Sequence, residues 1–373
     1  MRHFALLSTS LCAGLISIAP AHGLDVKVYG QVNKALVGFD DGVASDVAVV
    51  DNDHSSTRMG VKGEQKLDNG MTASVLMEME MQSNPSNLMV QNSTAGQSST
   101  PLSGSNAGTG NTPTLEERHA AVGLSGAWGG LWLGKTGTAS DGVFTKDKAG
   151  VADIMTSDVF RIGGGLNFRT TAGAMSGATL ANMTYSGATD RTNLLRYDTP
   201  KLNGFSGKLS VAQGGDMDVS AQYENKLGDL DVAAAASMKW NNDNSSTATN
   251  TIDTRTSLAL SAKHSSGFAG TLAYAADGLG NETATAQDPE QWYAKVSYAW
   301  DAYQVAVDYG MAEHFGTGVT LDESELTTYG VGAQYTMGHG VSVAGMYRNF
   351  DAERSGASLQ DIEMFVANVK VKF

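Results

Sequence analysis

The chain has 373 residues and is acidic, with 25 Lys+Arg against 39 Asp+Glu and a formal net charge of −14. This balance argues against nucleic acid as a partner, because surfaces that bind nucleic acid are basic. Glycine is abundant (44 residues), proline is scarce (6), and polar residues separate runs of alternating apolar ones, a composition typical of many strands joined by polar loops.

Residues 1–23 are interpreted as a cleaved secretory signal peptide. A basic start precedes an apolar stretch, and small residues allow cleavage either after Ala21 or after Gly23. The only cysteine, Cys12, lies in this leader, so the mature domain, 24–373, is expected to have no thiol and no disulfide. Without Arg2 the mature chain has 24 Lys+Arg against 39 Asp+Glu, a net charge of −15.

Beyond the leader, apolar and polar residues alternate in segment after segment, which is the pattern of half-buried strands. Val305, Val307 and Tyr309, for example, alternate with Gln304 and Asp308. The segment 115–126 alternates poorly, so its facing stays open. Sixteen candidate strands can be counted in this way: 25–38, 55–66, 70–82, 115–126, 129–137, 191–199, 205–213, 217–226, 229–240, 254–265, 267–276, 289–300, 303–313, 325–337, 340–351 and 361–373.

The connections alternate between tight turns, such as 67–69 and 301–302, and longer segments. The longer ones are 39–54, 83–114, 138–190, 241–253, 277–288, 314–324 and 352–360. Short turns on one rim and long loops on the other are typical of a closed up-and-down antiparallel barrel. A strand of about 11 residues tilted near 40° rises ~28 Å, close to the ~25 Å apolar band of an outer-membrane barrel.

Aromatic residues gather near the expected strand ends, where a membrane meets water. They are Tyr29, Trp128, Trp132, Phe205, Phe268, Trp300, Tyr303 and Phe373. The fold class predicted is therefore all-β, a transmembrane up-and-down antiparallel β-barrel of about 16 strands. The alternative from another class is a soluble, secreted β-rich adhesin or binding protein, whose apolar strand faces would point inward.

Several segments, taken in chain order, resemble the Gram-negative general porins. They are Val28-Tyr-Gly-Gln31, Ser56-Thr-Arg-Met-Gly-Val-Lys-Gly63 with Leu67-Asp-Asn-Gly70, Arg118-His-Ala-Ala-Val-Gly-Leu124, Leu133-Gly-Lys135, Leu195-Arg-Tyr-Asp-Thr-Pro200 with Gly204-Phe205, and the terminal Phe373. The resemblance implies a sixteen-stranded, homotrimeric channel of the outer membrane, in contact with membrane lipid and lipopolysaccharide. It also implies that 138–190 folds into the lumen as a constriction loop, and that the barrel-assembly machinery reads Phe373.

The constriction of that family sets a basic ladder on the wall against acidic residues on the inserted loop. The basic candidates here are Arg58, Lys62, Arg118, Arg191 and Arg196, and the acidic candidates are Asp141, Asp147, Asp153 and Asp158. Arg58 and Lys62 share one strand face, and turning that face to lipid would cost ~2–4 kcal/mol per basic residue at mid-depth. Arg191 and Arg196 differ in parity, so both face inward only with a bulge.

The segment 138–190 is longer than the inserted loop usual in that family. Its part from Phe160 to Tyr185 alternates enough to contain an extra hairpin. Such a hairpin would either raise the strand count to eighteen or plug the lumen more heavily. The second outcome keeps open a substrate-specific or plugged channel in place of a general one.

Enzymatic chemistry finds no support in the sequence. The seven histidines have no metal-ligand spacing and no neighbouring nucleophile motif, so no catalytic residue, metal or cofactor is predicted. Acidic loops such as Asp40-Asp41 and Asp322-Glu323-Ser324-Glu325 either bind a divalent cation or form a solvated rim. The predicted function is passive diffusion of small hydrophilic solutes and ions through a water-filled lumen.

Overall fold

The computed structural model describes residues 24–91, 114–187, 190–242, 251–280, 286–315 and 324–373. The predicted signal peptide, 1–23, and the acidic pair Asp322-Glu323 lie outside the described residues. Within the described part, no helix is long and apolar enough to cross a membrane.

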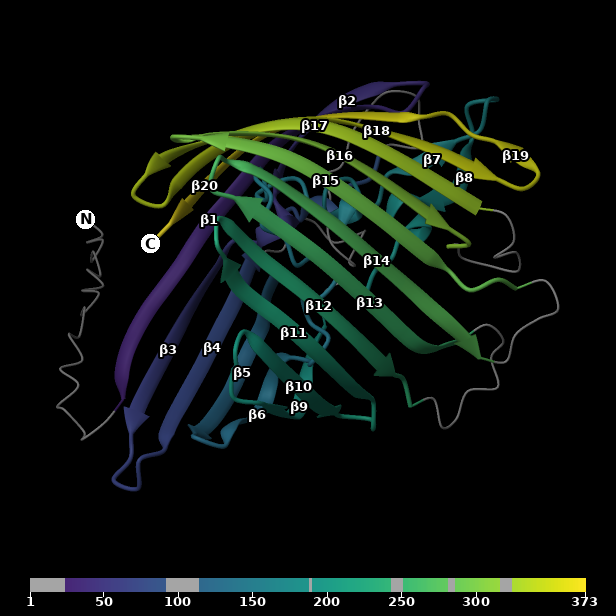
Figure 1. Ribbon diagram of the computed structural model, residues 1–373. Coiled ribbons are helices and arrows are strands. Elements are labelled where there is room, and N and C mark those ends of the chain that lie inside the picture. The colour runs from purple at the N-terminus through teal and green to yellow at the C-terminus, as the bar shows by residue number, and fades with distance from the viewer. Residues whose placement is uncertain (1–23, 92–113, 188–189, 243–250, 281–285, 316–323) are drawn as a thin grey trace, which may run out of the picture.

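All the described strands except β7 and β8 form one large antiparallel sheet that closes on itself (Figure 1). Of its 18 strands, β2 (Ser45–Asp51) and β19 (Ala357–Ser358) belong to loops at the rim. The other sixteen form the barrel wall: β1 (Asp25–Asp40), β3 (Arg58–Lys66), β4 (Thr72–Gln82), β5 (Thr114–Gly126), β6 (Gly129–Gly137), β9 (Arg191–Asp198), β10 (Phe205–Ala212), β11 (Met217–Leu227), β12 (Leu230–Trp240), β13 (Thr251–His264), β14 (Phe268–Gly280), β15 (Glu290–Trp300), β16 (Tyr303–Glu313), β17 (Ser324–Gly338), β18 (Val341–Arg354) and β20 (Ile362–Lys372).

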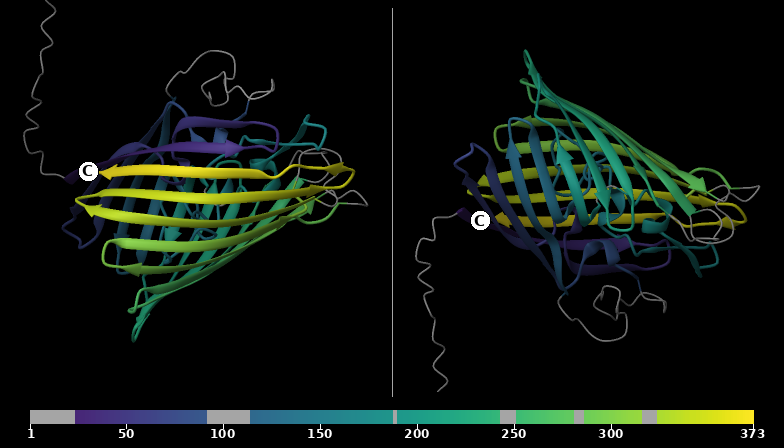
Figure 2. Two further views of the ribbon diagram at one scale, coloured as in Figure 1. Left: turned by 90° about the horizontal axis from the view of Figure 1, so that it is seen from above. Right: turned by 90° about the horizontal axis from the view of Figure 1, so that it is seen from below.

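Each wall strand pairs with the next, and β20 closes the barrel on β1 over the register Gln31↔Lys372 to Asp40↔Glu363. Every one of the sixteen predicted strands overlaps one wall strand, so the predicted fold class is confirmed. The C-terminus lies at the rim with the short turns, at the opposite end from the hairpin that carries β19 (Figure 2).

The poor alternation of 115–126 has a local cause. The β4–β5 register shifts between Glu78 and Met79, which pair with His119 and Glu117, so Arg118 is the extra residue of a β-bulge. A bulge reverses the phase of alternation along the strand. A single period-of-two pattern therefore cannot describe the whole of β5.

The wall carries apolar side chains outside and polar or small ones inside, as a strand period of two requires. On β16, Val305, Val307 and Tyr309 are exposed to the outside, whereas Asp308 is buried inside. Outer aromatic residues stack in a row near the short turns, with Trp300 5.6 Å from Tyr298 and 5.7 Å from Tyr303 between ring centroids. These contacts agree with an aromatic girdle at the membrane interface.

Two of the predicted girdle residues face the lumen instead. The Tyr29 hydroxyl donates to Glu78 (2.9 Å). Trp132 lies between outward-facing Leu131 and Leu133, and its ring packs on Gly123 across the β5–β6 pair. Their positions near strand ends were predicted from composition, whereas strand parity decides which face they occupy.

The segment 138–190 contains a small hairpin of its own, β7 (Asn167–Arg169) with β8 (Met175–Thr179), in a separate sheet. The hairpin therefore leaves the wall at sixteen strands, so the eighteen-stranded alternative is wrong. It contacts the loops of the long-loop rim, where Arg169 pairs with Asp41 (2.6 Å) and the Thr171 amide donates to the Ser358 carbonyl (3.1 Å). Together with the 3₁₀ turns η3 (Val159–Arg161) and η4 (Leu180–Met183) it builds an apolar core inside the barrel. Fully buried members of that core are Phe144, Ile154, Met155, Leu166, Phe168, Leu180 and Tyr185.

Candidate functional site

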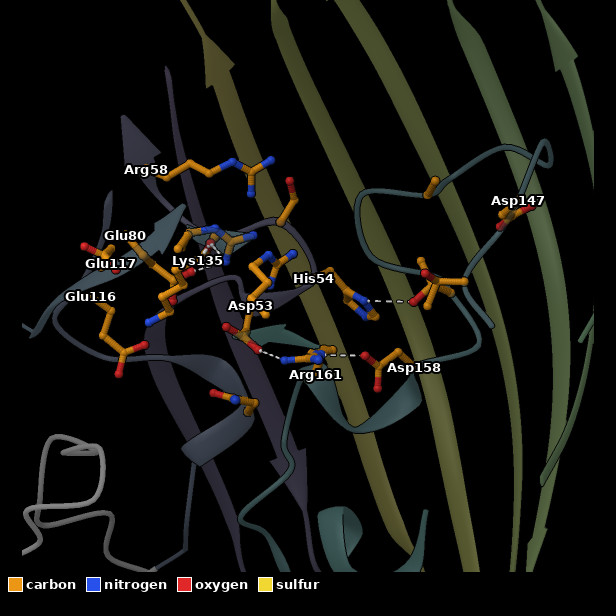
Figure 3. A pocket seen from close by; sticks show the side chains of 18 residues that line it. Asp53, His54, Arg58, Glu80, Glu116, Glu117, Lys135, Asp147, Asp158 and Arg161 are labelled. Atoms are coloured by element: carbon orange, nitrogen blue, oxygen red, sulfur yellow. Dashed lines mark hydrogen bonds and ion pairs between the residues drawn. The ribbon is translucent and has the colours of Figure 1, made fainter. Parts of the chain in front are cut away.

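A cavity of about 540 Å³ lies between the segment 138–190 and the wall around β3 to β6 (Figure 3). Its charged lining residues are Asp53, Arg58, Glu80, Glu116, Glu117, Arg118, Lys135, Asp147, Asp158, Arg161 and Arg191. Glu80, Glu116, Glu117, Arg58 and Lys135 lie on the wall side, whereas Asp147 and Asp158 come from the inserted segment. The cavity is thus polar and carries both signs of charge.

Two basic residues of the wall, Arg58 and Arg118, are paired with carboxylates of β4. Arg118 forms an ion pair through Nε with Glu78 (2.6 Å) and a second through a terminal nitrogen with Glu80. Arg58 lies 3.5 Å from Glu78, which also accepts the hydrogen bond from Tyr29. These carboxylates compensate much of the positive charge that a basic ladder would otherwise present.

Glu78 and Glu80 are not among the site residues predicted from the sequence, although the alternation of residues along β4 places both in the lumen. They alternate on β4 with Met77, Met79 and Met81, which are 55%, 38% and 41% exposed on the outside. An outward methionine stripe turns the intervening glutamates into the lumen. Only the folded wall reveals that their partners are Arg58 on β3 and Arg118 on β5.

Arg161 on the inserted segment links the loop to the wall side of the cavity. Its guanidinium pairs with Asp158 (2.6 Å) on the same segment and with Asp53 (2.8 Å) in the 3₁₀ turn η1 (Asp53–Ser55) before β3. Burial raises the pKa of Asp53 and of Asp158, and the nearby Arg161 charge opposes that rise. Burial lowers the pKa of Arg161, but the two carboxylates outweigh it and hold the pKa above its ordinary value.

His54 follows Asp53 and joins η1 to the inserted segment. Its Nδ1 lies 3.0 Å from the Thr156 hydroxyl, and its Nε2 is buried without a hydrogen-bond partner among the described residues. Burial lowers the pKa of His54 well below its ordinary value, and the charges of Arg348, Arg161 and Lys295 lower it further. The imidazole is therefore neutral at pH 7.

Four charged lining residues form no ion pair with any described residue: Glu116, Glu117, Lys135 and Arg191. The Arg191 Nε is also buried without a hydrogen-bond partner in the described part. These side chains are the charges with which a passing solute could interact without breaking an existing ion pair.

Arg191 and Arg196 both lie inside the barrel, although neither pairing of β9 has a bulge. Arg196 sits between outward-facing Leu195 and Tyr197, and it pairs with Asp198 (2.8 Å). Arg191 is the first residue of β9, where the chain leaves the inserted segment, and its side chain reaches the cavity. The expectation that a bulge is required was wrong. A long side chain at the first residue of a strand can turn into the lumen even when strand parity assigns that residue to the outer face.

Of the nine predicted constriction residues, Arg58, Arg118, Arg191, Asp147 and Asp158 line the cavity. The other four lie elsewhere. Lys62 stands over the Tyr29 ring (5.6 Å), and Arg196 is held by Asp198. Asp141 accepts from the Asp190 amide (3.0 Å), and Asp153 pairs with Lys370 on β20. The inserted segment crosses the whole lumen, so only part of it borders the cavity.

Wall side chains hold the inserted segment along the side of the barrel away from the cavity. Ser210, Ser261, Ser297 and Gln304 accept hydrogen bonds of 2.8 Å from the amides of Ala139, Lys148, Gly150 and Val151. Buried ion pairs add to this attachment, joining Asp147 to Lys295 on β15 and Asp153 to Lys370. The cavity of about 540 Å³ therefore lies off-centre, beside β3 to β6.

The chain end contributes a contact of its own. Phe373 exchanges two backbone hydrogen bonds with Gly30 on β1, each 3.0 Å long, and its side chain is exposed on the outside.

No group of three or more His, Cys, Asp or Glu side chains in the described ranges could hold a metal ion.

Comparison with known proteins agrees with this architecture. The model of the family described as Gram-negative porin matches residues 5–355. An anion-selective porin from Comamonas acidovorans superposes with a TM-score of 0.61 and 15% identity, covering 94% of this chain and 100% of that chain. OmpF of Salmonella typhi gives 0.59 and 16%, with 93% and 97% covered.

OmpT of Vibrio cholerae, described in its trimer form, gives a TM-score of 0.59 and 16% identity and covers 94% of this chain and 99% of that chain. At these identities the structures establish similarity of fold. No curated protein matches.

Proposed function

Because the chain belongs to the Gram-negative porin family, we propose that solutes cross its barrel through the off-centre cavity beside β3 to β6. The protein is an outer-membrane β-barrel channel for diffusion and not an enzyme. A secreted adhesin, the alternative from another class, does not agree with this family or with a closed wall that is apolar on the outside.

One observation supports this path for solutes. The cavity is lined by charged side chains of both signs, and four of them have no ion-pair partner among the described residues. A water-filled passage of this kind admits hydrated and dipolar solutes and disfavours apolar ones. Diffusion down a gradient then needs no energy input, and the inserted segment limits solute size.

The charges of the cavity favour weak ion selectivity. Five lining residues are cationic and six are carboxylates. We infer that Arg58, Arg118 and Arg191 form the basic side of the constriction, and that Asp147 and Asp158 belong to its acidic side. One structural relative is described as anion-selective; here Glu116 and Glu117 add negative charge, so a strong anion preference is not expected.

The second candidate is a substrate-specific channel of low conductance. The attachment of the inserted segment from β10 to β20, with its own apolar core, supports this candidate because much of the lumen is filled. It differs from the general porin in conductance and not in fold.

The outer face of β1 and β3 to β5 supports assembly as a trimer. Outward residues there are aliphatic or methionine, for example Val28, Val32 and Met77, and these strands carry no outward aromatic residue. Lys34 also points outward, paired with buried Asp51 (2.5 Å) and opposite Val369 in the middle of β20. A charge at that depth is costly against lipid, so we propose that this face packs against another copy.

Two further proposals concern export and assembly. Residues 1–23 are proposed to be removed as a signal peptide, after Ala21 or after Gly23. Phe373 is proposed to be read by the barrel-assembly machinery, which its exposed side chain would permit.

Single-channel recording of the mature chain in a planar bilayer tests the function, with a salt gradient to read selectivity. Large steps that close in threes would support an open trimeric diffusion channel, and a small reversal potential would support a constriction of balanced charge. Insertion with very low conductance would favour the substrate-specific channel. A chain that never enters the bilayer would contradict both.

A further inference from the structure

A second, smaller cavity of about 170 Å³ lies between the two ends of the inserted segment and the inner face of β12 and β13. Ser140 comes from the start of the segment, and Tyr185 and Asp190 come from its end. None of the residues that line this cavity also lines the larger one beside β3 to β6. We call it the β12–β13 cavity.

The wall contributes two pairs of residues that lie directly opposite each other. Ser237 on β12 is in register with Ser257 on β13, and Lys239 is in register with Arg255. All four line the β12–β13 cavity, so their side chains face the lumen. Lys239 is the last residue but one of β12, which begins at a short turn, so the cavity lies in the long-loop half of the barrel.

The charged groups at the β12–β13 cavity already have ion-pair partners. Lys239 Nζ lies 2.6 Å from Asp190 Oδ2 and 3.3 Å from Asp216 Oδ2. Arg255 Nε lies 3.5 Å from Asp277 Oδ1. A charged ligand would compete with one of these pairs and leave a buried charge uncompensated, which is costly. The arrangement therefore favours a neutral ligand.

Hydrogen-bonding capacity remains at Ser237 and Arg255. The hydroxyl of Ser237 is buried without a hydrogen-bond partner among the described residues, and the residue is only 7% exposed. Buried hydroxyls are normally hydrogen-bonded, because an unpaired one has lost its bonds to water. The terminal nitrogens of Arg255 donate to no other group in the described part of the chain, although a guanidinium has five N–H donors.

The rest of the lining is rich in hydroxyl groups. Ser140, Ser186 and Ser257 each contribute one, and the Tyr185 hydroxyl lies 3.0 Å from Ser257 Oγ. A hydroxylated solute both donates and accepts hydrogen bonds, as these groups do, and brings no charge. A volume of about 170 Å³ corresponds to about five or six water molecules at ~30 Å³ each, which is room for one small solute.

We propose that the β12–β13 cavity is a binding site, on the path of entering solutes, for a small neutral polyhydroxylated molecule of the polyol or simple sugar class. Ser237 and the Arg255 guanidinium supply the hydrogen bonds that hold it. The proposal rests on the proposed function in one respect, because the solute reaches the cavity by diffusion through the lumen from the long-loop side.

The first test measures binding of glycerol, xylitol and glucose to purified, folded porin by saturation-transfer NMR. Ser237→Ala removes the unpaired hydroxyl, and Ser237→Leu also fills the cavity. Ser220→Ala is the matched control, because the Ser220 hydroxyl is likewise buried without a partner among the described residues and is in register with Ser237, but does not line the cavity. Heat-dependent gel mobility verifies that each variant is folded.

Wild type and Ser220→Ala should bind at least one of the three probes saturably and with equal affinity. Ser237→Ala should bind it about 2- to 10-fold more weakly, as expected for the loss of one neutral hydrogen bond, and Ser237→Leu should show no saturable binding. Unchanged affinity in Ser237→Ala, or a wild type that binds no probe, would overturn the proposal. Tighter binding of gluconate or glucosamine than of glucose would overturn the neutral class of ligand.

Channel conductance of the same wild-type preparation separates this failure from a failure of the proposed function. A porin that conducts ions but binds none of the probes contradicts the binding site alone, whereas a folded chain that does not conduct contradicts the proposed function.

The second test places the site on the solute path. Influx of the bound probe into vesicles that contain the porin is measured over a range of probe concentrations. The influx rate should level off for wild type and Ser220→Ala, because the site becomes saturated, and should rise linearly for Ser237→Leu. Linear influx through wild type over the range that saturates the site would overturn its place on the path.

Discussion

The ring of Phe373 lies directly over the backbone of Gly30, where the last strand closes the barrel on the first. A Cβ added to Gly30 would lie 2.5 Å from Phe373 Cζ and 2.8 Å from the Arg58 carbonyl oxygen. The two residues also exchange two backbone hydrogen bonds of 3.0 Å. Closure of the wall therefore depends on a glycine at this position of β1 and an aromatic residue at the chain end.

Gly30→Ala should lower the thermal stability of the folded barrel. The added methyl has no space and must displace the Phe373 ring or the backbone of β3, at a cost of about 1–3 kcal/mol. Gly38→Ala is the matched control, since its Cβ would meet Val47 at an ordinary 3.8 Å on the same face of β1. Heat-dependent gel mobility measures the difference, and equal melting of both variants would contradict this account.

Arg58→Glu should move the reversal potential toward cation selectivity. The change places a carboxylate in the cavity beside Glu78 and Glu80 and removes a positive charge from its lining. Lys62→Glu lies on the same face of β3 but outside the cavity, so its effect should be clearly smaller. A salt-gradient recording reads both variants; no shift for Arg58→Glu would remove Arg58 from the constriction.

Lys295→Met should loosen the inserted segment. Lys295 is fully buried and pairs with Asp147, so its removal leaves a buried carboxylate unpaired, at a cost of about 3–5 kcal/mol. Adding Asp147→Asn should recover much of that loss. Lys148→Met is the control, because its pair with Asp231 (2.9 Å) is partly exposed and worth about 0–1 kcal/mol. The loss of unfolding midpoint and the rise in open-channel current noise should be largest for Lys295→Met, smaller for Lys295→Met/Asp147→Asn and smallest for Lys148→Met.

His54 should make the barrel less stable in acid. Its pKa in the folded state lies well below the ordinary 6.5, so below pH 6.5 the unfolded chain takes up a proton that the folded chain excludes. Stability is then lost as the pH falls, by about 1.4 kcal/mol per pH unit at most. His54→Asn should flatten this slope between pH 7 and pH 5.

The wall strands could be predicted from the sequence because each one carries its own signal. Alternation with a period of two appears within ten residues, and turn residues mark the ends. The segments 289–300 and 303–313 show this, since both coincide with β15 and β16 to within one residue. The family resemblance also follows from short local motifs, such as Leu195-Arg-Tyr-Asp-Thr-Pro200, and needs no contact across the barrel.

The pairing of the charges could not be predicted in this way, because it depends on register and on the path of the inserted segment. Asp147 and Asp153 look alike in the sequence, yet they reach Lys295 and Lys370 on different strands. Glu290 and Glu353 are 63 positions apart and share one row only because four strands align. The alternating pattern of each strand therefore determined the barrel. Which charges meet was decided by the closure of the wall and by the path of the inserted segment through the lumen, because both depend on contacts between residues distant in the chain.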